Sequence, residues 1–335
     1  MKRLGLLVTA ILASLLVAEL LIRLLGAAPQ VYVIRKGRFQ LSANPRIGYE
    51  PVPLSYSGKE LSFYDYQGAS NSLGYRDVEH AVAKPPGVYR VVVLGDSIAA
   101  GLRVDRFADT FPPVLAGLLT ARGLKAEVIN LSVSGYNTQQ EVETLKEKGL
   151  RYRPDLVLLA YSLGNRGRLD GDIMRTLLDE ERERQGVSGT RVNPYLVKSA
   201  LYRFVRFRAL AARRPAEADP RRYLDLVSND TVAQYFGVLA ELAHQQHFDV
   251  LVAVFPRFVK SFGYYRFGEQ HAFVRDLAQR NGFDLVDLLE PYARCRDASA
   301  EPISVDYFHP SVYGHRCAAE ALAEAILQRV KPAPR

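Results

Sequence analysis

Short apolar runs that alternate with helical segments constrain the fold of this chain more than any other sequence feature. The runs are YRVVVLG (89–95), AEVINLS (126–132), DLVLLAYS (155–162), FDVLVAVF (248–255) and FDLVDL (283–288). Helices are predicted over 111–123, 138–149, 270–280 and about 310–330. Apolar strands separated by helices form a parallel sheet that is covered on both faces. The sequence therefore predicts an α/β fold, a three-layer αβα sandwich around a five-stranded parallel sheet of flavodoxin-like type.

The remaining segments suggest how the chain is divided. A length of 335 residues is ordinary for one large α/β domain with insertions. Residues 29–88 have no sustained period and are predicted to be a linker and wrapping segment, followed by the main domain over 89–332. Residues 166–230 interrupt the alternation as an insertion. Its arginine-rich stretch 194–214 is predicted to be either a helix with a solvated basic face or an amphipathic lid on anionic lipid or a substrate groove.

The N-terminus carries a long apolar segment, because Glu19 is the only charged residue between Leu4 and Ile22. As a helix, this segment would span about 28 Å, close to the hydrocarbon thickness of a bilayer. An uncleaved signal anchor, a transmembrane helix over residues 1–28, is favoured, and a cleaved signal peptide is the alternative. Lys2 and Arg3 favour a cytoplasmic N-terminus. We therefore expect a single-pass protein of the cell membrane, with its main domain on the extracytoplasmic (periplasmic) side.

Charge and composition restrict the partners. The formal net charge of +8 fits nucleic acid or an anionic membrane surface. Because no zinc-finger, homeodomain or RNA-recognition signature is present, no nucleic-acid partner is expected. Neither a metal nor a cofactor is expected, since the histidines lack ligand spacing and no glycine-rich phosphate loop occurs. The oligomeric state is left open. Cys295 and Cys317 are either buried thiols or a disulfide.

Several chemically useful residues follow strands of the predicted sheet. Ser97 follows the first strand, Gly135 the second, Asn165 the third, and Asp306 with His309 the fifth. Each of them alone would be an ordinary turn residue. Together they lie at the carboxyl edge of one parallel sheet, where open α/β folds bind ligands. A nucleophilic serine needs a base and the base needs an orienting group, which Ser97, His309 and Asp306 could supply.

Two residues close to these candidates have structural interpretations. Asp96 is expected to fix the turn around Ser97 rather than to act as a catalytic acid. His315, in the predicted last helix, is expected to be a packing or capping residue. A disulfide between the two cysteines, if formed, would bracket the segment that holds Asp306 and His309.

The order of these motifs resembles that of the SGNH/GDSL hydrolases. VVVLGDS, INLSVSG and DYFHP are similar to the first, second and last blocks of that family. The resemblance covers roughly residues 73–330, and with NSLGYRDVE upstream it is similar to membrane-anchored bacterial members. It implies that Ser97 is the nucleophile, with Asp306 orienting the base His309. It also implies that the amides of Ser97 and Gly135 form an oxyanion hole.

The third block departs from the family pattern. The family usually has Gly-x-Asn-Asp, whereas this chain has Leu163-Gly164-Asn165-Arg166. Asn165 is therefore either a third oxyanion donor displaced by one residue or not a donor. The resemblance implies a serine esterase acting on a small-molecule or glycan ester, such as an O-acetyl group on an envelope glycan or lipid. The alternatives are an O-acyltransferase of cell-surface polysaccharide using the same triad, and a catalytically decayed glycan-binding or assembly protein.

Overall fold

The computed structural model describes residues 2–28, 39–53, 70–163, 177, 195–205, 229–259 and 262–330. The chain divides into two compact units. The first consists of Met1–Arg35 and Arg175–Asp225, and the second of Lys36–Met174 and Leu226–Arg335.

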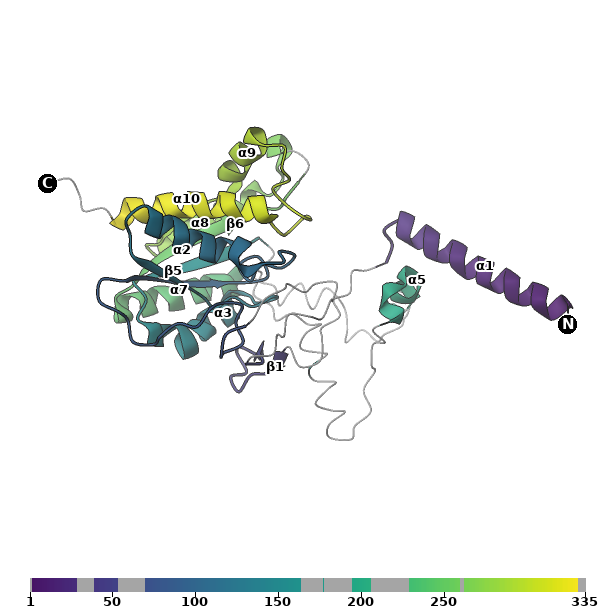
Figure 1. Cartoon of the computed structure of the whole chain (residues 1–335), viewed down its shortest axis with the longest axis horizontal. Helices are drawn as coiled ribbons and strands as arrows, with labels where there is room; N and C mark the ends of the chain where they lie inside the picture. Colours follow the sequence, from purple (N-terminus) through teal and green to yellow (C-terminus); the bar gives the residue numbers. More distant parts are fainter. Residues whose placement is uncertain are drawn as a thin grey trace. The chain divides into compact units, whose positions relative to one another are not determined.

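The second unit is built on a five-stranded sheet (Figure 1). Its strands are β3 (Tyr89–Gly95), β4 (Ala126–Asn130), β5 (Leu156–Ser162), β6 (Asp249–Phe255) and β7 (Asp284–Asp287). Their order is β4-β3-β5-β6-β7, and every neighbouring pair is parallel. The central strand β5 is buried at every position, as its continuous apolar run predicts. The predicted five-stranded parallel sheet is confirmed.

Helices cover both faces of this sheet and complete the three layers (Figure 1). On one face lie α2 (Phe111–Ala121) and α10 (Val312–Val330), whose Leu115, Leu119, Leu322 and Ile326 share a core cluster with the sheet. On the other face lie α3 (Thr138–Thr144) and α7 (Asn229–Gln246). The helix α8 (Gly268–Arg280) contacts α7, and α9 (Leu289–Ala298) contacts α10. Short 3₁₀ turns occur at Phe107–Asp109, Leu150–Tyr152 and Phe262–Tyr264, and a π turn at Leu145–Gly149 extends α3.

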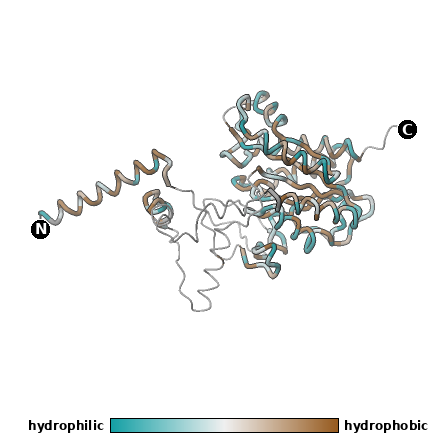
Figure 2. Tube along the Cα trace, turned by 180° about the vertical axis from the view of Figure 1, so that it is seen from behind, coloured by the Kyte–Doolittle hydropathy of each residue, from teal (hydrophilic) through white to brown (hydrophobic). Residues whose placement is uncertain are grey.

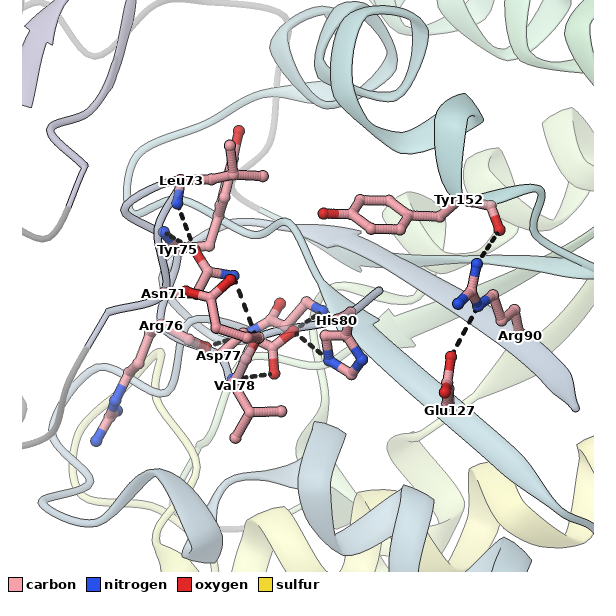
Figure 3. Close-up of polar contacts among 12 residues, drawn as sticks. Asn71, Leu73, Tyr75, Arg76, Asp77, Val78, His80, Arg90, Glu127 and Tyr152 are labelled. Atoms are coloured by element: carbon pink, nitrogen blue, oxygen red, sulfur yellow. Dashed lines mark hydrogen bonds and ion pairs between the residues drawn. The ribbon is translucent and has the colours of Figure 1, made fainter. Parts of the chain in front are cut away.

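Residues 39–53 and 70–88 wrap onto this body. The short antiparallel pair β1 (Phe39–Leu41) and β2 (Tyr49–Pro51) is tied down by Tyr49, whose hydroxyl donates to Ser134 O at 2.9 Å. Further along, the buried Asp77 accepts a 2.7 Å hydrogen bond from the amide of Asn130 at the end of β4 and lies beside His80 (Figure 3). The segment therefore reaches the carboxyl edge of the sheet.

The first unit contains α1 (Lys2–Leu24), the 3₁₀ turn η4 (Leu196–Lys198) and α5 (Ala200–Arg203). In α1, the 20 residues Gly5–Leu24 are long and apolar enough to cross a membrane, and none of that stretch is buried. Figure 2 shows that apolar residues predominate along this helix. A signal sequence would have the same length and composition. Most of the predicted insertion lies outside the described residues, but residues 195–205 of its basic stretch are described and include α5.

Candidate functional site

Ser97 stands at the carboxyl edge of the sheet, two residues after the last residue of β3. The turn that carries it begins at Gly95, where a Cβ atom would come within 2.9 Å of the Ala99 Cβ. Asp96 closes the turn by accepting a hydrogen bond from the Ile98 amide at 2.9 Å, which confirms its expected structural role. Burial raises the pKa of Asp96, although the Ile98 amide opposes that shift. The half-buried Ser97 side chain is thus held on a fixed backbone.

A chain of hydrogen bonds joins Ser97 to two residues near the C-terminus. Ser97 Oγ lies 2.9 Å from Nε2 of the buried His309. The other ring nitrogen, Nδ1, lies 2.9 Å from both carboxylate oxygens of Asp306. Asp306 Oδ1 also accepts the amides of Phe308 and His309, each at 2.8 Å. The structure therefore brings together the serine, the imidazole and the carboxylate that the sequence singles out.

The protonation state of Asp306 follows from these contacts. Burial alone would raise its pKa, but the hydrogen bond and charge of His309 and the two backbone amides outweigh burial and lower it to about 2. The carboxylate is therefore ionised at neutral pH. An ionised carboxylate holds the proton on Nδ1 of His309, so Nε2 is left to accept the Ser97 hydroxyl proton.

The loop that carries Asp306 and His309 is fixed at both ends. A backbone bridge joins Ser304 and Pro310, and the amide of Phe258 donates to Tyr307 O at 3.0 Å. Cys295 in α9 and Cys317 in α10 form a disulfide that brackets this loop. The structure thus decides between the two states of the cysteines that the sequence leaves open.

Two backbone amides at this edge suit an oxyanion. Gly135 has a φ of 83° in the turn after β4, a conformation that favours glycine. That turn is tied to the serine turn, because the amide of Val133 donates to Gly95 O at 3.1 Å. Among the described residues, no carbonyl or side chain accepts a hydrogen bond from the amide of Ser97 or Gly135. Asn165, with its neighbours Gly164 and Arg166, lies outside the described residues.

Arg103 also contacts this site, and no local sequence pattern indicates it. Its Nε lies 3.3 Å from Asp306 Oδ2, the carboxylate oxygen that accepts no backbone amide from the described residues. Arg103 has a φ of 72°, the left-handed region that side chains other than glycine rarely adopt. Strained backbone of this kind persists where the surrounding structure enforces it.

A buried arginine enforces the conformation of the Arg103 loop. Arg76 belongs to the NSLGYRDVE motif, and Figure 3 shows its guanidinium pointing away from Asp77 and His80. Its Nη1 and Nη2 atoms donate to four carbonyls on either side of Arg103, those of Ala100 (3.2 Å), Gly101 (2.7 Å), Val104 (2.7 Å) and Asp105 (2.9 Å). The motif therefore contributes to the site indirectly, by shaping the loop that presents Arg103.

An aromatic rim borders His309. Tyr307 and Phe308 are 37% and 39% exposed, although both are large hydrophobic residues. The guanidinium of Arg257 lies 4.1 Å from the Phe308 ring centroid, a cation–π contact. Exposed aromatic faces next to a reactive group offer packing surface for a ligand.

A sequence model of the GDSL-like lipase/acylhydrolase family matches residues 93–317, two thirds of the chain. The chain belongs to this family. As a GDSL-like member it is a serine ester hydrolase, and the match contains Ser97, Gly135, Asp306 and His309.

Solved structures resembling this GDSL-like protein include an acetyl xylan esterase, AlAXEase, at 15% identity and a TM-score of 0.44, covering 71% of this chain and 99% of that one. The lipase/acylhydrolase from Enterococcus faecalis matches at 18% identity and a TM-score of 0.42, covering 74% and 100%. A catalytic mutant of an acetylxylan esterase from Geobacillus stearothermophilus matches at 16% identity and 0.45, covering 71% and 94%. No curated protein sequence matches the chain.

Proposed function

We propose that Ser97 is the nucleophile of this esterase, with His309 as its general base and Asp306 as the group that orients His309. The observation that carries the proposal is the 2.9 Å contact between Ser97 Oγ and His309 Nε2, two residues separated by 212 positions in the sequence. A nucleophile, a base and a third orienting group within hydrogen-bond reach are the arrangement that acyl transfer needs.

The reaction proceeds in two halves on these groups. The Ser97 hydroxyl attacks the ester carbonyl while His309 Nε2 takes its proton, and the amides of Ser97 and Gly135 stabilise the oxyanion. The tetrahedral intermediate then expels the alcohol, which receives that proton from His309, and an acyl-serine remains. Water attacks the acyl-serine with His309 again as base, which releases the carboxylic acid and restores Ser97.

For the substrate, we propose an ester on a glycan or lipid of the cell envelope, such as an O-acetyl group. Two observations support an extracytoplasmic enzyme held by α1. The stretch Gly5–Leu24 has the length and apolarity of a membrane span, and the Cys295–Cys317 disulfide suits an oxidising compartment. The exposed rings of Tyr307 and Phe308 beside His309 supply flat faces on which a sugar ring or an acyl chain can pack.

The test of the proposed nucleophile is Ser97→Ala. Because the covalent step needs Oγ, we expect kcat/KM for short p-nitrophenyl esters to fall by about 10³-fold or more. Labelling by a fluorophosphonate probe should also disappear. Ser299→Ala is the matched control, since Ser299 follows α9 and its hydroxyl accepts the amide of Glu301, outside the triad. A Ser97→Ala protein that still turns over or still labels would refute the assignment.

Assays of the wild-type protein with glycan substrates distinguish hydrolysis from acyl transfer. We expect acetylated oligosaccharides to yield free acetate even when a non-acetylated acceptor glycan is added. Acetyl transfer to the added glycan in preference to water would instead make the protein an acyltransferase with the same nucleophile. A wild-type protein with no turnover of any of these esters and no labelling would favour a binding role.

A further inference from the structure

Glu19 is an unusual residue for a membrane span, because it is the only charge in the apolar stretch from Leu4 to Ile22. A carboxylate within a bilayer is costly unless it has partners, and such residues commonly have a function. Within the first unit, Glu19 has three partners on the inserted segment. It accepts the Ser199 hydroxyl at 2.7 Å and the amides of Ala200 at 2.9 Å and Leu201 at 2.7 Å.

These contacts hold the start of α5 against α1 (Figure 1). The amides of Ala200 and Leu201 belong to the first turn of α5, where no helical carbonyl is available to them. Arg23 completes the attachment, since its Nε donates to Glu19 at 2.6 Å and its Nη2 donates to Lys198 O at 2.9 Å. Glu19 and Arg23, which we call the α1 clamp, therefore bind the described part of the inserted segment through four hydrogen bonds.

The position of the clamp along α1 sets its depth in a bilayer. Glu19 lies five residues before Leu24, the last residue of the span, which is about 7.5 Å along the helix axis. Arg23 lies within the last turn. A segment bound at this level meets the boundary between the hydrocarbon and the headgroups rather than the centre of the bilayer.

The inserted segment has the composition of a membrane interface. Its side chains Tyr195, Leu196 and Val205 are 79%, 51% and 45% exposed. Residues 195–205 also contain Lys198 and Arg203 but no acidic residue. Tyrosine and basic side chains with apolar neighbours favour the headgroup region, where the rings and stems lie among acyl chains and the cations meet phosphates.

We propose that residues 195–205, which we call the interfacial segment, lie in the surface of a bilayer containing anionic phospholipid and are held there by the α1 clamp. The proposal rests on α1 spanning the membrane, as proposed above. It gives α1 a role beyond anchoring, because the helix organises part of the folded chain and must remain attached to it. The single charge in the apolar stretch is then explained as the attachment point.

The chain contains no tryptophan, so one substitution creates a unique fluorescent reporter. Tyr195→Trp in the full chain is reconstituted into vesicles of phosphatidylethanolamine and phosphatidylglycerol. We expect the tryptophan emission of this variant, the interfacial reporter, to lie at shorter wavelength than that of a tryptophan in water. Lipids brominated on the acyl chain should quench it. Tyr264→Trp is the reference for a fluorophore in water, because Tyr264 is 94% exposed on the second unit.

The clamp is tested by adding Glu19→Leu to the Tyr195→Trp chain. Leucine keeps α1 apolar but removes the hydrogen bonds that Glu19 accepts from Ser199, Ala200 and Leu201, so we expect most of the bromolipid quenching to be lost. Thr9→Leu is the matched control, because the Thr9 hydroxyl donates to Gly5 O within α1 and to no other described residue. Quenching that is equally strong with Glu19→Leu would overturn the role of the clamp.

Flotation of the vesicles separates failure of this proposal from failure of the anchor. A chain that does not float with vesicles has no membrane-spanning α1, and both proposals then fail. A Tyr195→Trp chain that floats but has the same emission as the Tyr264→Trp reference leaves the anchor intact and overturns the interfacial position. An interfacial reporter whose emission is blue-shifted but not quenched by brominated lipid is buried against protein, which also overturns that position.

Discussion

Arg103 contacts the proposed triad through Asp306 without belonging to it. It combines a strained backbone, a loop enforced by the buried Arg76, and an ion pair with Asp306. The Ser97–His309 contact needs Asp306 in one orientation. Two backbone amides hold Oδ1 of Asp306, and Arg103 contacts Oδ2. We therefore interpret Arg103 as a positioning residue that acts through Asp306.

We predict that Arg103→Met lowers kcat/KM about fivefold, since a partly exposed ion pair contributes up to about 1 kcal/mol. The loss should appear in kcat and leave KM unchanged, because Arg103 acts through Asp306 and not on the substrate. Arg103→Lys, which keeps the positive charge, should restore most of kcat. Arg106→Met is the matched control, since Arg106 in the same loop pairs with Asp109 instead. A kcat that Arg103→Lys does not restore would contradict the positioning role.

His315 has the packing role that its sequence position suggests. It is fully buried in α10, and its Nδ1 accepts the amide of Phe111 at 3.2 Å. Burial, with the nearby positive charge of Arg76, lowers the pKa of His315 from 6.5 to about 3. The folded protein therefore keeps this imidazole neutral across the physiological range.

The lowered pKa of His315 predicts acid destabilisation. As pH falls below 6.5, His315 binds a proton in the unfolded chain but stays neutral in the folded chain. The stability present above pH 6.5 is therefore lost progressively down to about pH 3. Between pH 7 and 5 the loss from this group is about 2 kcal/mol. Urea unfolding at the two pH values should show a smaller difference for His315→Gln, which has no titrating group, than for the wild type. An equal difference in both proteins would contradict the prediction.

At the scale of elements, the Cys295–Cys317 disulfide joins α9 and α10 around the loop that carries Asp306 and His309. The bridge closes a segment of 22 residues, and cross-linking such a loop restricts the unfolded chain. Its effect should therefore appear both in stability and in the order of that loop.

We predict that replacing both cysteines by alanine lowers the free energy of unfolding by about 3 kcal/mol. Thermal unfolding of the wild type in excess reductant should match that of the double variant in either condition. A wild-type transition that reductant does not move would show that the bridge contributes nothing to stability.

At the scale of the whole molecule, every residue proposed for catalysis lies in the second unit, whereas α1 and the interfacial segment lie in the first. Activity toward small soluble esters should therefore be separable from attachment to a membrane. We predict that deletion of residues 1–28 leaves kcat/KM for short p-nitrophenyl esters unchanged and moves the protein to the aqueous fraction after detergent phase separation. A truncated chain that is folded by circular dichroism but inactive would show that α1 is needed for catalysis itself.

The sequence by itself determined the fold and the edge of the sheet where the site lies. Apolar runs and helix periods are local signals, and once β3 to β7 are parallel, Ser97, Gly135 and the Asp306–His309 pair must follow strands at one edge. For the same reason the structural roles of Asp96 and His315 were predictable from their neighbours.

Only the tertiary structure decided the contacts between segments distant in the sequence. Arg103 reaches Asp306 because Arg76, from the wrapping segment, binds the carbonyls of the loop that carries Arg103. Glu19 contacts Ser199 inside the insertion, whose own sequence pattern indicates only a basic amphipathic stretch. Cys295 and Cys317 pair because α9 and α10 pack together. Such contacts depend on the geometry of packed elements, which no local period or propensity encodes.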